Sequence, residues 1–258
     1  DESYDHVGFS ATLALKDVML VLAAGEAARV PLPGANTLRD RLLGELAPAL
    51  SAGGAVAVQV SVADGAVGGE GVFAFSSEGS PKDAVVSFWL EASADRAWAE
   101  ALLAEAFATM HGYLVCESRP IVAPGPVQPG DRSAGASQIT CIAARDDLTH
   151  AEFVARWQGE FCAAAIECQD TMAYVRNEVV RPLTDDAPDW WAIVEETFPL
   201  AALTDPEVFY DAVGDPERLA ANQARLFEAV GELIDLSRVD ARFYSEYRFD
   251  TDNRRVPR

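Results

Sequence analysis

The hydrophobic positions in the first half of the chain follow two periods. The apolar run at 18–24 and the alternating valines at 56–62 are typical of β-strands. Between them, leucines recur every three or four residues after Thr37, which predicts an amphipathic helix. The predicted order is strand, helix, strand, strand, helix, strand, over residues 18–24, 37–50, 56–62, 84–90, 94–108 and from 112 onward.

The second half of the chain repeats this order. Thr149 and Glu152 have the spacing of a capping box, and the helix that follows carries Phe153, Trp157 and Phe161 at four-residue intervals. Proline at the first helical position predicts the start of the last helix. We predict a strand at 138–144, a helix from 149, strands at 172–181 and 190–198, helical segments from 204 and 215, and a strand at 241–249.

This repeated order is the split βαβ order of a ferredoxin-like sheet. Two such sheets can pack face to face and enclose a space. We therefore predict an α+β fold of two tandem ferredoxin-like βαββαβ domains, packed sheet to sheet as an intrachain α+β barrel. The predicted parts are a divergent N-terminal domain at 1–124, a Pro/Gly-rich linker at 125–136, a C-terminal domain at 137–250 and a tail at 251–258.

Composition and charge narrow the choice of partners. The 258 residues are 50% hydrophobic and 24% charged, which is typical of a globular protein. The net charge of −21 repels phosphate backbones and anionic lipid, so we expect neither nucleic acid nor membrane as a partner. The four cysteines lack zinc-ligand spacing. The sequence shows no signal-peptide pattern and no apolar run of membrane-spanning length, so we expect a cytoplasmic protein.

Polar residues on otherwise apolar strands are the candidates for chemistry, because alternation sends one face of each strand inward. Tyr174 and Arg176 share one face of their predicted strand, and Asn177 lies on the other. Tyr244 and Glu246 share a face of the last strand. We expect one face of the sheet to bring tyrosines, arginines and carboxylates together, either as an active site or as a structural Arg–Glu network.

In an enclosed space, a carboxylate with a raised pKa could move a proton, and an arginine could hold a carboxylate or enolate. His111 opens a strand, where a general base could reach a bound ligand. The candidate catalytic residues are Tyr174, Glu195, Tyr244 and His111. The candidate substrate-binding residues are Arg176, Asn177, Trp190, Trp191 and Glu246.

Two short motifs in the second half carry a family resemblance. Phe153-x-x-x-Trp157, then Tyr174-x-x-Asn177, then a late helix with Asn222 and Phe227 resemble an EthD-like domain of the dimeric α+β barrel superfamily. The similarity covers about 137–249. It implies a small, usually cofactor-free barrel that acts on hydrophobic, often aromatic or polyketide-like molecules. Many EthD-like helices carry a histidine one turn after the tryptophan, and here that position is Phe161.

The function that this resemblance implies is a cofactor-independent enzyme of the lyase, dehydratase, decarboxylase or cyclase type. It would act by acid/base chemistry on a small aromatic or polyketide-like compound. The expected partners are that ligand and, for assembly, a second copy of the chain as a homodimer. The alternatives are a non-catalytic binding protein for a hydrophobic metabolite, or a haem protein of the peroxidase or chlorite dismutase kind. The haem alternative needs an axial ligand, and His150 is the only histidine in the second half.

Overall fold

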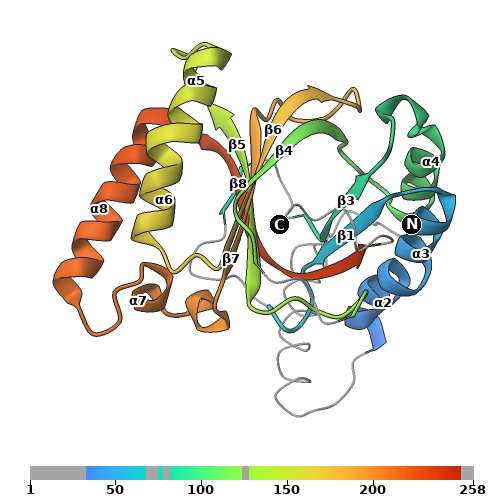
Figure 1. The fold of residues 1–258 in the computed structure, drawn as a ribbon, viewed down its shortest axis with the longest axis horizontal. Helices are drawn as coiled ribbons and strands as arrows, with labels where there is room; N and C mark the ends of the chain where they lie inside the picture. Colours follow the sequence, from blue (N-terminus) through green and yellow to red (C-terminus); the bar gives the residue numbers. More distant parts are fainter. Residues whose placement is uncertain (1–32, 68–74, 78–81, 124–127, 251–258) are drawn as a thin grey trace, which may run out of the picture.

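The structure is a computed structural model that describes residues 33–67, 75–77, 82–123 and 128–250 (Figure 1). The strand expected at 18–24 lies outside the described residues. Within them, eight strands form one curled antiparallel sheet in the order β3-β1-β8-β5-β7-β6-β4, and β2 also pairs with β8. The strands are β1 (Ala57–Val62), β2 (Phe75–Ser76), β3 (Ala84–Trp89), β4 (Tyr113–Ile121), β5 (Ala136–Ala144), β6 (Ala173–Pro182), β7 (Ala192–Phe198) and β8 (Ile234–Asp250).

Strand β8 joins the two halves of the chain. Its residues 234–244 pair with β5, and its residues 245–250 pair with β1. The described residues therefore form a single sheet that bends along β8, and they do not confirm two tandem ferredoxin-like domains with separate sheets. The predicted last strand at 241–249 is also too short, because β8 begins at Ile234, directly after the last helix.

The described part of the expected linker also contacts β8. The amide of Gly130 donates to the Arg248 carbonyl at 2.7 Å, and the amide of Ser133 donates to the Glu246 carbonyl at 2.8 Å. These bonds bring the segment alongside the C-terminal half of β8. The stretch before β5 is therefore a packed connection rather than a free tether.

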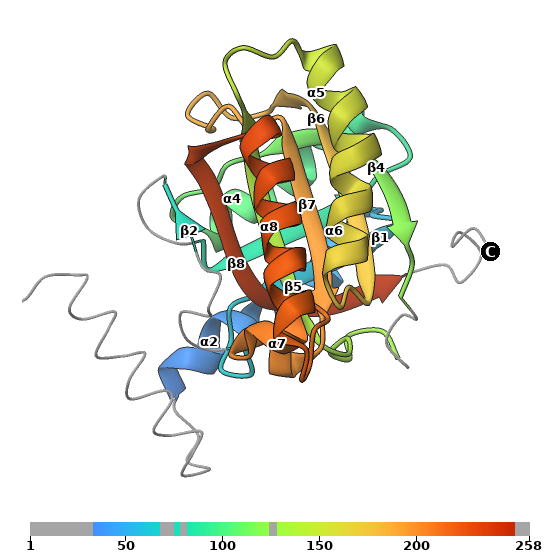
Figure 2. The ribbon, with the colours of Figure 1, turned by 90° about the vertical axis from the view of Figure 1, so that its left-hand side faces the viewer.

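The helices lie outside the curve of the sheet, in two groups. In Figures 1 and 2, α5, α6, α7 and α8 cover the sheet beside β5, β6 and β7, and in Figure 1 α2, α3 and α4 lie on the side of β1 and β3. Short π-helical or 3₁₀ turns connect or flank several of them. The helical elements are α2 (Pro33–Arg41), η1 (Leu42–Leu46), α3 (Ala47–Gly53), η2 (Ser93–Asp95), α4 (Ala97–Ala106), α5 (His150–Arg156), η3 (Trp157–Phe161), α6 (Cys162–Cys168), η4 (Leu200–Leu203), α7 (Pro206–Phe209) and α8 (Pro216–Leu233).

The capping residues foreseen in the sequence are in place. Thr149 accepts from the amide of Glu152, and the Glu152 carboxylate accepts from the amide of Thr149, which confirms the capping box of α5. The Asp215 carboxylate accepts from the amide of Arg218 at the start of α8, and Pro216 is in the first turn of that helix.

Alternation along β8 shows which face of the sheet is which. Val239 and Ala241 pack in the core under α5, α6 and α8, and Phe243 packs with residues of η4 and α7. Farther along, Tyr247 and Phe249 pack in the core under α2, α3 and α4. From Val239 to Phe249, the odd-numbered residues of β8 therefore face the helices on the convex side; Ile234, which precedes an irregularity in the pairing with β5, also packs in that core. The even-numbered residues face the concave side, because successive side chains alternate.

Gly135 gives a direct test of how β5 enters the sheet. Its φ is +83°, and an added Cβ would lie 2.3 Å from the backbone oxygen of Phe198 on β7. Gly214 has a φ of +71° but open space around the same position. We expect Gly214→Ala to lower the free energy of unfolding by about 1–2 kcal/mol through backbone strain alone. Gly135→Ala adds a backbone clash, so its loss should be larger, about 3 kcal/mol or more.

Urea unfolding of the two variants checks this difference. Equal losses for both glycines would contradict the close approach of residue 135 to β7.

Candidate active site on the concave face

The predicted site residues are divided between the two faces of the sheet. Tyr174 packs with Phe153 and Trp157 in the convex core. Trp191 also lies there, with its ring 5.5 Å from that of Phe153, and Arg176 donates to the Gln158 carbonyl of η3 at 3.0 Å. The expectation that the tyrosines and arginines of β6 and β8 share one face is therefore wrong.

The remaining strand candidates lie on the concave face. Ala192 and Val194 of β7 belong to the convex core, so their neighbour Glu195 points the other way. The same alternation places Asn177, Tyr244 and Glu246 on the concave side. Trp190 joins them through its contacts with Cys141, Ala143 and Val179, in a cluster completed by Tyr113, Val115 and Ile193.

Glu195 is the centre of the concave face. Its side chain is buried, and it accepts hydrogen bonds from Gln59 Nε2 at 2.5 Å and from Asn177 Nδ2 at 2.8 Å. Gln59 belongs to β1, and β8 and β5 lie between β1 and β7 in the sheet. The Gln59–Glu195 bond therefore crosses the concave side and links the two halves of the chain.

The electrostatic surroundings favour the protonated form of Glu195. Burial raises the pKa of this carboxyl above its usual 4.5, and repulsion from Glu246 adds to the effect. The hydrogen bonds from Asn177 and Gln59 act in the opposite direction. Glu195 is thus a buried acid that two amides hold in a fixed orientation, as a proton-transfer group requires.

Several buried polar atoms on this face have no hydrogen-bond partner within the described part of the chain. They are Ser61 Oγ, Ser137 Oγ and Trp190 Nε1. Each of these residues is at most 2% exposed. Buried polar groups are normally satisfied, so these three atoms are exceptions to the rule.

Tyr244 and His111 do not contact Glu195. The Tyr244 hydroxyl donates to the backbone carbonyl of Lys82 at 3.1 Å, and burial raises the pKa of this phenol above its usual value of 10. His111 is exposed just before β4, where its Nε2 lies 3.8 Å from the carboxylate of Asp186. The concave geometry brings together Glu195, Asn177 and Glu246 of the predicted set and leaves these two at its margins.

Gln59 and Glu196 were not among the predicted site residues. Gln59 carries a visible signal, since it is the one amide in an otherwise valine-rich alternating strand. Glu196 follows Glu195 but faces the convex core, where its Oε1 has no partner in the described residues. Burial raises the pKa of Glu196 to about 8. Tyr174 Oη and Trp157 Nε1 are unpartnered in the same core.

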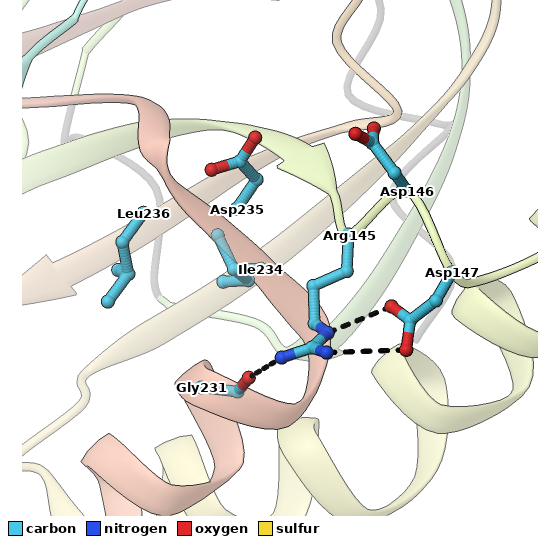
Figure 3. A pocket seen from close by; sticks show the side chains of 7 residues that line it. All are labelled: Arg145, Asp146, Asp147, Gly231, Ile234, Asp235 and Leu236. Carbon is cyan, nitrogen blue, oxygen red and sulfur yellow. Dashed lines mark hydrogen bonds and ion pairs between the residues drawn. The ribbon is translucent and has the colours of Figure 1, made fainter.

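A surface hollow of about 520 Å³ lies elsewhere, where β5 ends and α8 meets β8 (Figure 3). Its wall is an ion-pair junction: Arg145 donates to the carboxylate of Asp147 at 2.9 and 3.3 Å and to the Gly231 carbonyl at 3.0 Å. The predicted site residues do not line it. The lining residues are Arg145, Asp146, Asp147, Gly231, Ile234, Asp235 and Leu236.

Comparisons with known proteins give no match: no family model matches the chain, and neither the curated proteins nor the solved structures give a significant match. Among the described residues, no helix is long and apolar enough to cross a membrane. The same residues contain no group of three or more His, Cys, Asp or Glu side chains arranged to hold a metal ion.

Glu196 predicts a pH dependence of stability. Its pKa is about 8 in the folded chain against an ordinary 4.5, so between these values the unfolded chain loses this proton and the folded chain keeps it. The protonated Glu196 therefore makes its full contribution to the free energy of unfolding below about pH 4.5, and this contribution falls as the pH rises toward 8. This one group contributes a slope of at most about 1.4 kcal/mol per pH unit.

We expect Glu196→Gln to flatten the fall in unfolding free energy between pH 5 and 8. Glu228→Gln, at an exposed position of α8, should leave it unchanged. Thermal and urea unfolding across this pH range provide the measurement, and parallel curves for wild type and Glu196→Gln would contradict the burial of a protonated Glu196.

Proposed function

We propose that this chain is a cofactor-independent enzyme that acts by acid/base chemistry on a small aromatic or polyketide-like compound bound at the concave face. The observation that carries the proposal is Glu195, a buried carboxyl with a raised pKa that Gln59 and Asn177 hold in place. The unpartnered hydroxyls of Ser61 and Ser137 lie on the same face and supply hydrogen bonds for a ligand.

The reaction class follows from what a held carboxyl can do. As an acid, Glu195 gives its proton to a leaving oxygen or to an enolate. As a carboxylate, it takes a proton from the carbon next to a carbonyl. The two amides that donate to Glu195 stabilise its ionised form, so the group can cycle between the two states. Such a cycle serves dehydration, cyclisation, decarboxylation or another lyase step.

We also propose that the second half of the chain is an EthD-like domain, and the order of its strands supports this. Residues 136–250 run strand, helix, strand, strand, helix, strand and pair in the order β8-β5-β7-β6, which is compatible with a ferredoxin-like unit. The motif residues Phe153, Trp157 and Tyr174 form one core cluster, and Asn177 turns away from it to bind Glu195. These four residues thus build the core and one side of the proposed site. Of the other two that carry the resemblance, Asn222 donates to the Tyr210 carbonyl at 2.7 Å and Phe227 is 60% exposed.

A non-catalytic binding protein is the second candidate. Phe161, where EthD-like helices carry histidine, is buried in the core cluster of α5 and α6. His150 offers no substitute on the concave face, because it lies 3.9 Å from the carboxylate of Glu178 and its ring is 5.3 Å from that of Trp191, on the convex side. The same position disfavours His150 as a haem ligand inside the barrel.

Cellular location and assembly belong to the proposal as well. All four cysteines are unpaired. Free cysteines are typical of a reducing compartment, which supports a cytoplasmic location. A homodimer is the proposed assembly state, and its test is the mass in solution.

Adjacent glutamates on opposite faces allow a matched test of catalysis. We expect Glu195→Gln to lower kcat on aromatic β-hydroxy acids or keto compounds by about 10²-fold or more, because it removes the proton-transfer group. Glu196→Gln changes the same residue type one position away, on the convex face, and should keep near wild-type turnover. Steady-state assays of both variants give the comparison, and equal activity in the two would remove Glu195 from the mechanism.

A further inference from the structure

We propose that the apolar run at 18–24 pairs as a strand with the outer edges of β3 and β4 and completes the sheet as a barrel. This run lies outside the described residues. The proposal rests on the described sheet and on the repeated order of elements along the chain. It goes beyond the proposed function, because it assigns an occupant to the two edges of the sheet and does not involve the chemistry of Glu195.

The described sheet ends at β3 on one side and at β4 on the other. Within the described part of the chain, β3 pairs only with β1, and β4 pairs only with β6. All six residues of β3, AVVSFW, are partly exposed, whereas β1 and β5 in the middle of the sheet are almost entirely buried. An apolar edge strand is a template for pairing, and native proteins cover such edges. The two edges therefore need a partner.

Strand direction limits what that partner can be. Six successive pairings lead from β3 to β4, and all six are antiparallel. β3 and β4 therefore run in the same direction and cannot form an antiparallel ladder with each other. A single strand that runs the opposite way satisfies both edges at once. Together with the seven strands of the path it makes a fully antiparallel barrel, which has no edges.

One contact shows that the two edges approach each other. The guanidinium carbon of Arg119 on β4 lies 5.7 Å from the centre of the Trp89 ring on β3. Two strands with one strand between them are about 10 Å apart. An arginine and a tryptophan side chain that reach toward each other bridge such a distance, so the contact is compatible with one intervening strand.

The repeated order of elements identifies the intervening strand. In the second half of the chain, β5 lies between β7 and β8 and pairs with both. In the first half, β1 and β3 correspond to β6 and β7, and β4 corresponds to β8. The halves also meet in the same way twice, because β4 pairs with β6 and β8 pairs with β1. The counterpart of β5 belongs between β3 and β4, and the first strand that the sequence predicts in this half is 18–24.

The composition of the run suits that position. VMLVLAA is apolar at every residue, which is typical of a strand buried on both faces, and its counterpart β5 is buried at eight of nine positions. The concave face then becomes the interior of the barrel, which agrees with exposures of 4% for Gln59, 6% for Asn177 and 7% for Glu195. Glu195 is consequently reached from an end of the barrel and not between β3 and β4.

Cysteine crosslinking in the full chain tests the pairing. Cys116 on β4 is exposed, and the other three cysteines are buried. Single cysteines are placed at each position from 18 to 24, the dilute protein is treated with oxidised glutathione, and disulfides are mapped by mass spectrometry. Opposite residues of neighbouring strands are within disulfide reach, and side chains alternate between faces. We therefore expect intrachain disulfides with Cys116 at alternate positions, with about tenfold less product between them.

Two variants control for unspecific reaction. Cys116→Ser should abolish the disulfides, and Glu217→Cys, at an exposed position of α8, should form none with Cys116. No disulfide between 18–24 and Cys116, or equal yields at all positions of the run, overturns the proposal. Disulfides between two chains instead of within one also overturn it, because they assign the edges to a second copy.

Hydrogen exchange of the unmodified chain provides a second measurement in case the cysteine variants do not fold. A strand with partners on both sides has its amides protected, whereas an edge strand leaves a row of amides unpaired. We expect the amides of β3 and β4 to exchange as slowly as those of β1. Rapid exchange at alternate amides of β3 or β4 contradicts the proposed strand.

Discussion

Strand β8 makes two sets of hydrogen bonds, and the rest of the architecture depends on them. Its first part pairs with β5 and its last part with β1, so one continuous backbone fixes the position of the first half of the chain relative to the second. Curvature of the sheet then separates a convex face covered by helices from a concave face. The Gln59–Glu195 bond is possible only because β8 brings β1 and β7 around the same hollow side.

Strand alternation turns this curvature into two different chemical environments. Glu195 and Glu196 are consecutive and both buried, yet one is held by two amide donors and the other has an unpartnered oxygen against Tyr174 and the core of α5 and α6. Burial raises the pKa of both carboxyls. Of the two carboxyls, Glu195 combines that shift with a fixed geometry, and the proposed proton transfer rests on this difference.

Sequence patterns predicted the elements well because period and capping are local properties. The helix at Thr149, the proline start of α8 and the valine strand at 56–62 all depend on residues a few positions apart. The composition of the site was harder to predict. Alternation shows which residues of one strand share a face, but the phase between strands depends on register. Register placed Tyr244 on the same face of the sheet as Glu195 and on the opposite face from Tyr174. Sequence patterns also could not predict that both halves of the chain pair with β8, because this depends on the long-range pairing of β8 with β1.

Unpartnered buried atoms occur on both faces, so by themselves they do not distinguish a binding site from an imperfectly satisfied core. Ser61, Ser137 and Trp190 are matched on the convex side by Trp157, Tyr174 and Glu196. The unpartnered groups on the convex side are neutral side chains and a carboxyl that stays protonated. Each can stay buried without a hydrogen bond at a cost of about 1–3 kcal/mol. Arg242 has no neutral form to adopt, because guanidinium keeps its proton in proteins. Its nearest described carboxylate is Asp83, 4.0 Å away and 75% exposed, so a permanent charge lies beside the proposed site on the concave face.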